Sequence, residues 1–155
     1  MNKTLLAMMA AALLAGCATQ APPPAPVSTL SDTMMIIRQA AAAAPAGIPG
    51  HFRLLIRAAG RRDGEVYLNT QPDYRDPRNV TIVMPQAVAQ QAFGTTNPQQ
   101  LQQLLSGKTL AVSGVAFRTT IVFNCDDRAS GQPTKYYYQT HIRVSAAQQL
   151  TALGH

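Results

Sequence analysis

The stretch Gly64–Met84 constrains the fold most strongly, because it places two short apolar runs, 66–68 and 80–84, on either side of a polar loop. In the second run every other residue falls on the same face, which is the pattern of a half-buried β-strand. The residues expected on its buried face are Val80, Ile82 and Met84. The loop is rich in the turn formers Pro72, Asp73, Asp76, Pro77 and Asn79. The stretch therefore predicts two strands, 65–69 and 80–84, joined by a long loop within a sheet or barrel.

Further strands are predicted where apolar and polar residues alternate, at residues 51–59, 109–123 and 135–145. The first of these places Arg53 and Arg57 on the face opposite its apolar residues, and residues 60–64 then form a tight, basic turn. Gly114 interrupts the second strand and predicts a bulge or a sharp bend there.

The last predicted strand has two different faces. Tyr136 and Tyr138 fall on the face that we assign to the core. Tyr137, His141 and Arg143 share the opposite face, which is the one expected to meet solvent.

Helices are predicted at residues 31–46, 85–93 and 98–107. Ser31 is expected to cap the first helix and Pro45 to end it, and its alanine-rich surface leaves open whether it packs on the domain. Pro85 is expected at the first position of the second helix, and Asn97 is expected to cap the third.

Residues 1–16 have the features of a secretory signal peptide, with Lys3 followed by an apolar run. The run is shorter than the roughly 20 residues that a membrane-spanning helix needs. It ends in Leu14-Ala15-Gly16-Cys17, which resembles the lipobox of bacterial lipoproteins. The resemblance implies that the signal is removed, that the Cys17 thiol and the new amino terminus are acylated, and that the chain is anchored in a membrane.

Residues 17–30 are predicted to form a tether between the lipid anchor and the domain. The prolines that favour an extended, polyproline-like conformation are Pro22, Pro23, Pro24 and Pro26. Ala18 follows Cys17, where many lipoproteins of the inner membrane carry Asp. By resemblance to Gram-negative lipoproteins, this predicts the outer membrane, with the domain on the periplasmic side.

The order of the predicted elements is three strands, a helical segment and two strands, which is the order of a five-stranded OB fold. Residues 66–84 and 107–115 also resemble compact OB domains related to the nucleic-acid-binding superfamily, in which a Gly-Lys pair opens the fourth strand. The sequence therefore predicts a β-rich, OB-like barrel at residues 51–146. OB folds bind nucleic acid, sugars or proteins, so the resemblance implies no single ligand. The excursion 118–135 departs from a plain OB domain.

No catalytic constellation, cofactor motif or metal motif stands out in the sequence. Gly107-Lys108-Thr109 lacks the earlier glycine of a phosphate-binding loop, and no closely spaced Cys and His pairs suggest zinc. Cys125 has no partner for a disulfide within the chain if Cys17 is acylated. Cys125 with His141 as its base gives only thin support for a hydrolase.

The candidate ligand-binding face combines basic and aromatic residues: Arg53, Arg57, Tyr67, Tyr74, Arg75 and Arg78. OB folds bind single strands of nucleic acid on their second and third strands, with aromatic rings for stacking and cations for phosphates. A formal net charge of +6 also suits an anionic partner.

These observations favour a non-enzymatic envelope lipoprotein whose OB-like barrel binds a protein or a glycan in the periplasm. The alternative is a module that binds a polyanion or single-stranded nucleic acid. Nucleic acid is the less expected partner, because a periplasmic protein rarely meets it and only 6% of the residues are aromatic. A hydrolase that uses Cys125 or the acidic residues is a third hypothesis. The sequence does not identify the ligand or the oligomeric state.

Overall fold

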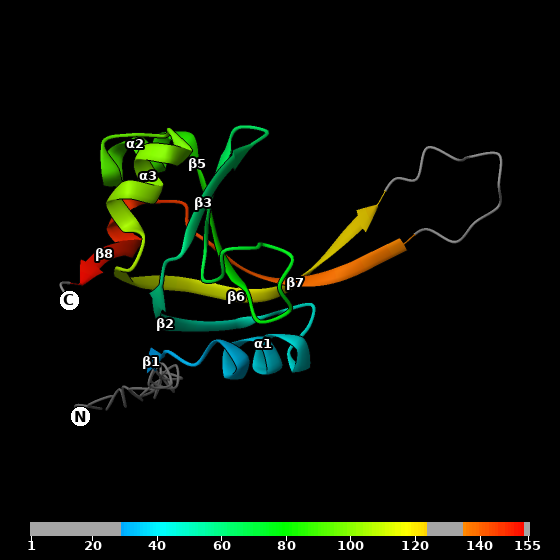
Figure 1. Cartoon of the computed structure of the whole chain (residues 1–155). Helices are drawn as coiled ribbons and strands as arrows, with labels where there is room; N and C mark the ends of the chain where they lie inside the picture. Colours follow the sequence, from blue (N-terminus) through cyan, green and yellow to red (C-terminus); the bar gives the residue numbers. More distant parts are fainter. Residues whose placement is uncertain (1–28, 124–134, 154–155) are drawn as a thin grey trace, which may run out of the picture.

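The computed structural model describes residues 29–123 and 135–153 (Figure 1). The predicted signal peptide 1–16, the lipidation site Cys17, the tether up to residue 28, and Cys125 lie outside the described residues. None of the helices in the described ranges has the length and apolar character that crossing a membrane requires.

The described residues form a single sheet with helices around it. The strands are β1 (Thr29–Leu30), β2 (Ile48–Leu55), β3 (Ala58–Arg62), β4 (Glu65–Asn69), β5 (Val80–Pro85), β6 (Thr109–Phe123), β7 (Lys135–Arg143) and β8 (Leu150–Leu153). The helices are α1 (Thr33–Ala42), α2 (Gln86–Phe93) and α3 (Pro98–Leu105), with a 3-10 turn at Ala147–Gln149. The strand order is β1-β2-β6-β7-β5-β4-β3, and β8 pairs with β6.

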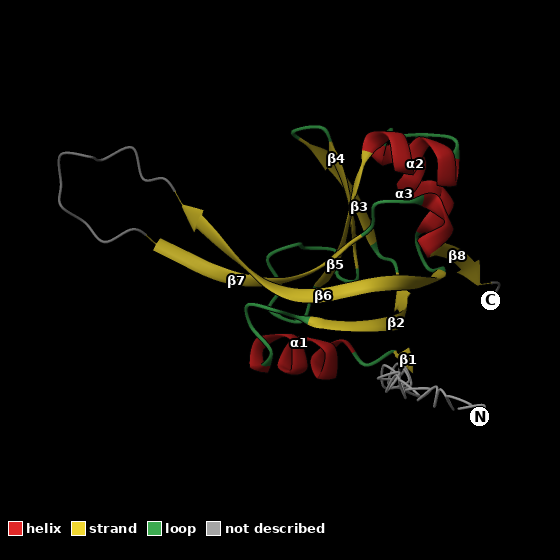
Figure 2. Ribbon diagram, turned by 180° about the vertical axis from the view of Figure 1, so that it is seen from behind, coloured by secondary structure: helices red, strands yellow, loops and turns green. Residues whose placement is uncertain are grey.

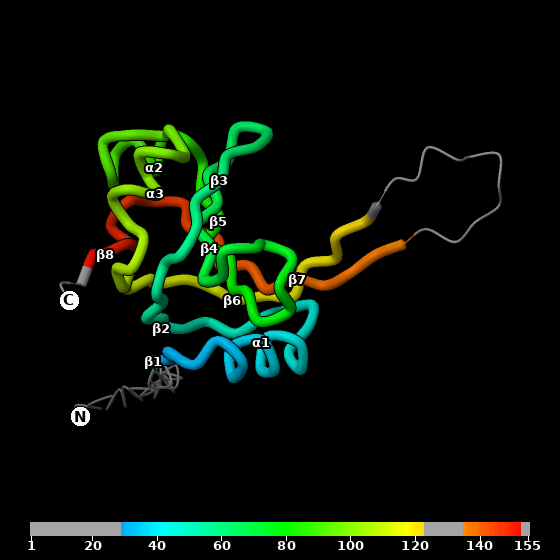
Figure 3. The backbone as a smooth tube through the Cα atoms, viewed as in Figure 1, coloured from blue at the N-terminus to red at the C-terminus, as the bar shows by residue number. Residues whose placement is uncertain are grey.

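This order is that of an OB-like barrel in which β2 and β3 are two halves of the first strand. β5 and β7 run parallel. The other neighbouring pairs along the strand order from β2 to β3 run antiparallel. At the break, the Ile56 amide donates to the Lys108 carbonyl at 2.9 Å, and the Arg57 amide donates to the Asn69 carbonyl at 2.8 Å. Successive residues thus bond to opposite edges of the sheet, so the chain closes the barrel (Figure 3).

The predicted OB-like fold is confirmed, with eight strands among the described residues in place of five. The first strand is broken into β2 and β3, because the chain turns from one edge of the sheet to the other between them. β1 is added beside β2, and β8 is added beside β6 beyond the predicted boundary at residue 146. Thr29 and Leu30, which we had assigned to the tether, therefore belong to the sheet.

β5 is buried on both faces, so the prediction of a half-buried strand was wrong. Val80, Ile82 and Met84 enter the core as expected, and Thr81 and Val83 on the other face are each only 2% exposed. The alternation along β5 does not reveal that its second face is buried. That burial comes from side chains of the neighbouring strands. Those neighbours in the register are Tyr67, Asn69, His141 and Arg143.

Helix α1 packs on the barrel and contributes Ile36 and Ala40, both fully buried, to the core. It lies along β2 and β6 (Figure 2). Its cap is Asp32 rather than the predicted Ser31, because the Asp32 carboxylate accepts hydrogen bonds from the amides of Met34 and Met35. The helix therefore begins one residue later than a cap at Ser31 would place it.

Helices α2 and α3 connect β5 to β6 and cover one end of the barrel (Figure 2). Pro85 is the last residue of β5 and immediately precedes α2. The sequence predicted it at the first position of that helix. Asn97 caps α3 as predicted: its side-chain oxygen accepts from the amides of Gln99 at 2.9 Å and Gln100 at 3.1 Å. The hairpin turn between β3 and β4 is shorter than predicted, because only Asp63 and Gly64 lie outside the strands.

The ends of β6 and β7 extend beyond the barrel as a two-stranded ribbon (Figure 1). β5 pairs with β7 only along residues 140–143, and β2 pairs with β6 only up to Ala116. Tyr136 and Tyr138 are therefore 58% and 48% exposed, and their assignment to the core was wrong. No bulge occurs at Gly114, since its pairing with Gly50 keeps the register of β2 and β6.

Gly50 lies under the ring of Phe52, which is fully buried. A Cβ atom at residue 50 would come within 2.9 Å of that ring, so we expect Gly50→Ala to lower the free energy of unfolding by about 1–3 kcal/mol. Gly60→Ala is the matched control, because a Cβ atom there meets nothing within 4 Å. Chemical denaturation of both variants measures the difference, and equal stabilities would contradict the packing described here.

Candidate functional site

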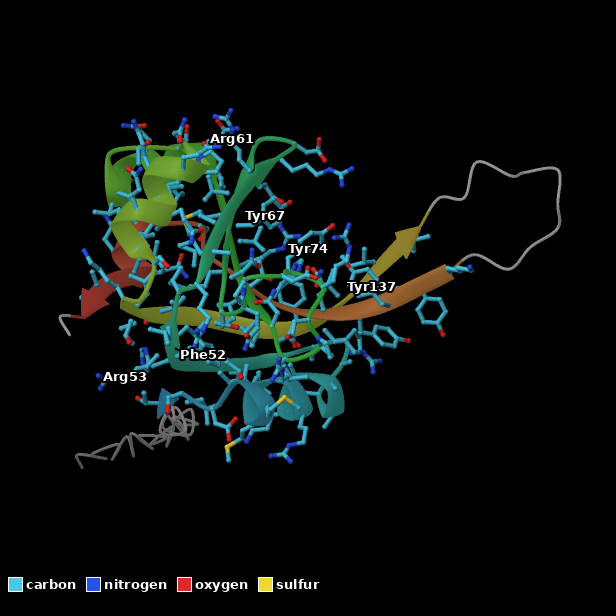
Figure 4. The ribbon with its side chains drawn as sticks, in the orientation of Figure 1. Phe52, Arg53, Arg61, Tyr67, Tyr74 and Tyr137 are labelled. Atoms are coloured by element: carbon cyan, nitrogen blue, oxygen red, sulfur yellow. The ribbon has the colours of Figure 1, made fainter. Side chains whose placement is uncertain are left out.

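A groove crosses the outer face of β4, β5 and β7, on the side opposite the core. It encloses about 350 Å³. Its lining includes Arg61, Tyr67, Asn69, Tyr74, Tyr137 and His141. Figure 4 shows Tyr67, Tyr74 and Tyr137 on the same side of the molecule, while Arg53 lies away from them near β2. The groove therefore gathers three tyrosines from two strands and the loop that connects β4 to β5.

Tyr67 is held at the groove by an acidic residue of its own strand. Its hydroxyl donates to Glu65 Oε2 at 3.0 Å, and Arg143 Nη1 lies 3.3 Å from Glu65 Oε1. Burial, followed by the hydrogen bond to Glu65, raises the pKa of Tyr67 above its usual value. The phenol thus keeps its proton at neutral pH, and its ring is fixed in place.

Asn79 holds the loop that carries Tyr74. Its Oδ1 accepts from the amides of Thr70 at 2.9 Å and Gln71 at 3.1 Å, which fixes the start of the loop. Its Nδ2 donates to the Tyr74 carbonyl at 3.3 Å and to Asn69 Oδ1 at 3.0 Å. Asn79 is only 4% exposed, so this buried amide joins both ends and the middle of the loop to the sheet.

Gln139 joins the same loop to β7. Its Nε2 donates to the Tyr74 carbonyl at 3.1 Å and to the Tyr137 hydroxyl at 2.8 Å. With the amide nitrogen turned that way, Gln139 Oε1 faces His141 Nε2 at 2.8 Å and accepts its proton in a hydrogen bond. The imidazole therefore carries its proton on Nε2.

His141 is uncharged at neutral pH. Its pKa is lowered to about 4, mainly by burial and also by the positive charge of Arg143, while Glu65 opposes the shift. The side chain also packs edge-on against Phe117, with the ring centroids 6.5 Å apart. A buried neutral imidazole contributes packing and a hydrogen bond to the groove floor, without positive charge.

Positive charge lies at the rim of the groove rather than on its floor. Arg61 and Arg62 project from the end of β3 and both line the groove. Arg62 pairs with Asp63 at 3.0 Å, but both side chains are more than three-quarters exposed, at 83% and 80%, so this pair contributes little stability. Among the described residues, Arg61 forms no ion pair. It is thus available to an anionic ligand.

The predicted binding residues do not form one face. Tyr67 and Tyr74 both line the groove. Arg75 stacks on the Tyr74 ring at 4.4 Å but lines a neighbouring hollow. Arg53 lies on the exposed face of β2, where it pairs with Ala111 of β6.

Arg57 and Arg78 do not line the groove either. Arg57 lies at the corner between β2 and β3, and its carbonyl accepts from Gln102 Nε2 at 2.7 Å. Arg78 is paired with Asp76 at 2.7 Å, and hydrogen bonds from Arg78 lower the pKa of Asp76 to about 2.

Sequence reasoning did not include Arg61, Tyr137, Gln139 or His141 in the candidate face. Tyr137 and His141 were placed together on the solvent face of the last strand, but their nearness to Tyr67 was not foreseen. That nearness depends on the parallel pairing of β5 with β7, in which Thr81 lies between Asn69 and His141. Placing the last predicted strand beside the third predicted strand, as the OB order implies, could have revealed that Tyr137 and His141 lie near Tyr67.

The groove has the chemistry of a binding site for rings and anions. It offers aromatic faces and rim guanidinium groups. Among residues 29–123 and 135–153, no cluster of three or more His, Cys, Asp or Glu side chains is suited to a metal ion.

No protein-family model matches the chain, and no curated protein matches its sequence. The chain is weakly similar to solved structures. A chain assigned as an aspartyl-tRNA synthetase from Leishmania major Friedlin has a TM-score of 0.39 and 5% identity, over 86% of this chain and 22% of that chain. The aspartyl-tRNA synthetase from Entamoeba histolytica has a TM-score of 0.35 and 10% identity, over 74% of this chain and 22% of that chain. At these TM-scores the similarity carries no functional argument.

The buried His141 should make stability fall in mild acid. Its pKa is about 4 in the folded chain against 6.5 in the unfolded chain, so the unfolded chain binds more protons between these values. We expect the free energy of unfolding to fall by about 3 kcal/mol as the pH drops from 6.5 to 4. Asp76 acts at lower pH, between its ordinary pKa of 3.8 and its pKa of about 2 in the folded chain.

Denaturation at several pH values measures this slope. His141→Gln should flatten it. A slope that persists in His141→Gln would show that another group causes it.

Proposed function

We propose that this OB-like domain is a non-catalytic binding module for a linear polyanion whose units carry flat rings, with single-stranded nucleic acid as the simplest ligand of this chemistry. The observation that carries the proposal is the gathering of Tyr67, Tyr74 and Tyr137 around one groove with Arg61 and Arg62 at its rim. Bases stack on aromatic side chains, and guanidinium groups bind phosphates.

The charge distribution supports an anionic ligand. The chain carries a formal net charge of +6, and the arginines at the groove rim extend into solvent, where they attract a polyanion before contact. Glu65 is the acidic group nearest Tyr67, and it is already engaged by Tyr67 and Arg143. Its charge is thus partly balanced within the protein.

A protein or glycan partner in the bacterial envelope is the second candidate. The observation that favours it is the lipobox-like segment ending in Cys17, together with the proline-rich tether. In that location, an acidic glycan would offer rings and anionic groups to the same tyrosines and arginines. In-situ cross-linking followed by identification of the captured envelope component separates this candidate from the first.

Binding of an oligothymidylate to the full-length chain, followed by fluorescence anisotropy at low salt, tests the proposal. Tyr67→Ala should weaken binding about tenfold or more, because one stacked base contributes about 1–3 kcal/mol. Arg61→Ala should weaken binding and reduce its salt dependence. Arg53→Ala is the charge-matched control, since Arg53 lies outside the groove, and it should change binding little.

Two results would reject this function. One is the absence of binding by the unaltered chain at low salt. The other is an equal loss of affinity in Arg53→Ala and Arg61→Ala, which would show that attraction depends on overall charge and not on the groove.

We also propose that acyl chains on Cys17 attach the protein to the outer membrane. Each buried methylene group contributes about 0.8 kcal/mol, so several acyl chains hold a protein far more firmly than one. Cys17→Ser should move the protein from the membrane fraction to the soluble fraction of cells expressing the full-length chain. Arg53→Ala in the same assay controls for expression, and membrane retention of Cys17→Ser would contradict the anchor.

A further inference from the structure

A second hollow lies on the other side of β7, between helix α1 and the β6–β7 ribbon. It is larger than the groove, at about 540 Å³. One wall is formed by Ile37 and Ala41 of α1, and the other by Arg118, Tyr136 and Tyr138 of the ribbon. Docking of α1 through Ile36 and Ala40 fixes the distance between these walls. The hollow therefore exists because helix α1, which precedes the barrel, is docked in this position.

Aromatic rings and guanidinium groups are paired on the ribbon side of this hollow. The guanidinium of Arg118 lies 4.4 Å from the centre of the Tyr138 ring. Tyr136 meets Tyr138 edge-on, with 5.5 Å between ring centres. Both tyrosines are about half exposed, although no core beneath them explains large aromatic residues at these positions. A flat ring stacked on Tyr138 would lie beside a fixed positive charge.

The loop residue Arg75 gives the hollow a second pair of the same kind. Its guanidinium lies 4.4 Å from the centre of the Tyr74 ring, and Arg75 lines the hollow while Tyr74 lines the groove. Asp76 also lines the hollow, but Arg78 holds its carboxylate at 2.7 Å. Arg75 and Arg118 therefore make the hollow positive overall.

The groove and the hollow adjoin at β7. Tyr137 and Gln139 line both of them, and Gln139 Nε2 donates to the Tyr74 carbonyl at 3.1 Å at their boundary. A chain that leaves the groove over Tyr74 thus meets Arg75 first, and then the rings of the ribbon. The aromatic–cationic surface continues from one depression to the next.

We propose that the hollow between α1 and the β6–β7 ribbon is a second subsite for the same ring-bearing polyanion, with Tyr138 as its stacking surface and Arg118 and Arg75 as its anion contacts. This proposal rests on the proposed function of the groove. It adds that a ligand long enough to pass Tyr74 binds more tightly than one that fills the groove alone, because it gains a second set of contacts on the same protein.

Length dependence tests this subsite in the full-length chain. We use two fluorescent oligothymidylates, one of about four nucleotides and one of about twelve, which span the range bound by single OB folds. Tyr138→Ala and Arg118→Ala should each weaken binding of the long oligonucleotide about tenfold and leave the short one within about twofold of the unaltered chain. Tyr67→Ala should weaken binding of both. Arg118→Ala should also reduce the salt dependence for the long oligonucleotide only.

Two control variants separate contact from charge and from folding. Arg38→Ala removes an exposed positive charge from α1 without touching the hollow, and should leave both affinities unchanged. Tyr138→Phe keeps the ring and should bind the long oligonucleotide as the unaltered chain does. Thermal unfolding of each variant, monitored by circular dichroism, verifies that the barrel is intact.

The outcomes distinguish the two proposals. If Tyr67→Ala weakens both oligonucleotides while Tyr138→Ala and Arg118→Ala bind the long one normally, the second subsite is rejected and the function of the groove stands. If Arg38→Ala weakens the long oligonucleotide as much as Arg118→Ala does, general charge explains the effect and the subsite is rejected. If the unaltered chain binds neither oligonucleotide at low salt, both proposals fail.

Discussion

The whole structure depends on the transfer of one strand between the two edges of a single sheet. Ile56 bonds to the β6 side and Arg57 bonds to β4, so no backbone hydrogen bond is lost while the chain changes partners. Ile56 is also 1% exposed, so its side chain lies in the core where the two halves of the strand meet. Closure removes most open edges and makes β5 a central strand covered on both faces. The outer face of β4, β5 and β7 then becomes a rigid floor on which side chains from distant parts of the chain can be positioned.

Alternation in the sequence predicted the strands and which side of most of them enters the core, because that pattern records local exposure. It placed Phe52 and Leu54 inside the barrel and Arg53 outside, as the structure does. It did not reveal that β5 stops pairing with β7 at Thr140, where the barrel gives way to the two-stranded ribbon, so it assigned Tyr136 and Tyr138 to a core that does not reach them. The extent of a sheet is set by pairing between strands far apart in sequence, and the sequence of one strand does not show where its neighbouring strands end.

The candidate site was predictable to the same limited extent. Tyr67 and Tyr74 belong to one hairpin-like stretch, so their nearness followed from local sequence. Arg53 and Arg57 share a strand face in the sequence pattern, but the break after Leu55 turns them toward different parts of the barrel. Gln139 and His141 join the groove only through the parallel pairing of β5 and β7, which brings together residues about 60 positions apart, such as Val80 and Thr140. Such long-range pairing follows from the OB order of strands, and no local pattern contains it.

The hydrogen-bonding state of the groove decides what kind of recognition it can perform. The polar groups of Tyr67, Gln139 and Asn79 already bond to partners inside the protein, so they fix the geometry of the groove more than they offer donors to a ligand. What remains for a ligand are ring faces and rim guanidinium groups. Ring faces can stack on any flat partner, and exposed guanidinium groups can donate to any phosphate or carboxylate, so the proposed ligand would be recognised as a class of polymer and not by a sequence within it. A neutral His141 whose Nε2 proton is committed to Gln139 is likewise suited to support such a surface rather than to transfer protons.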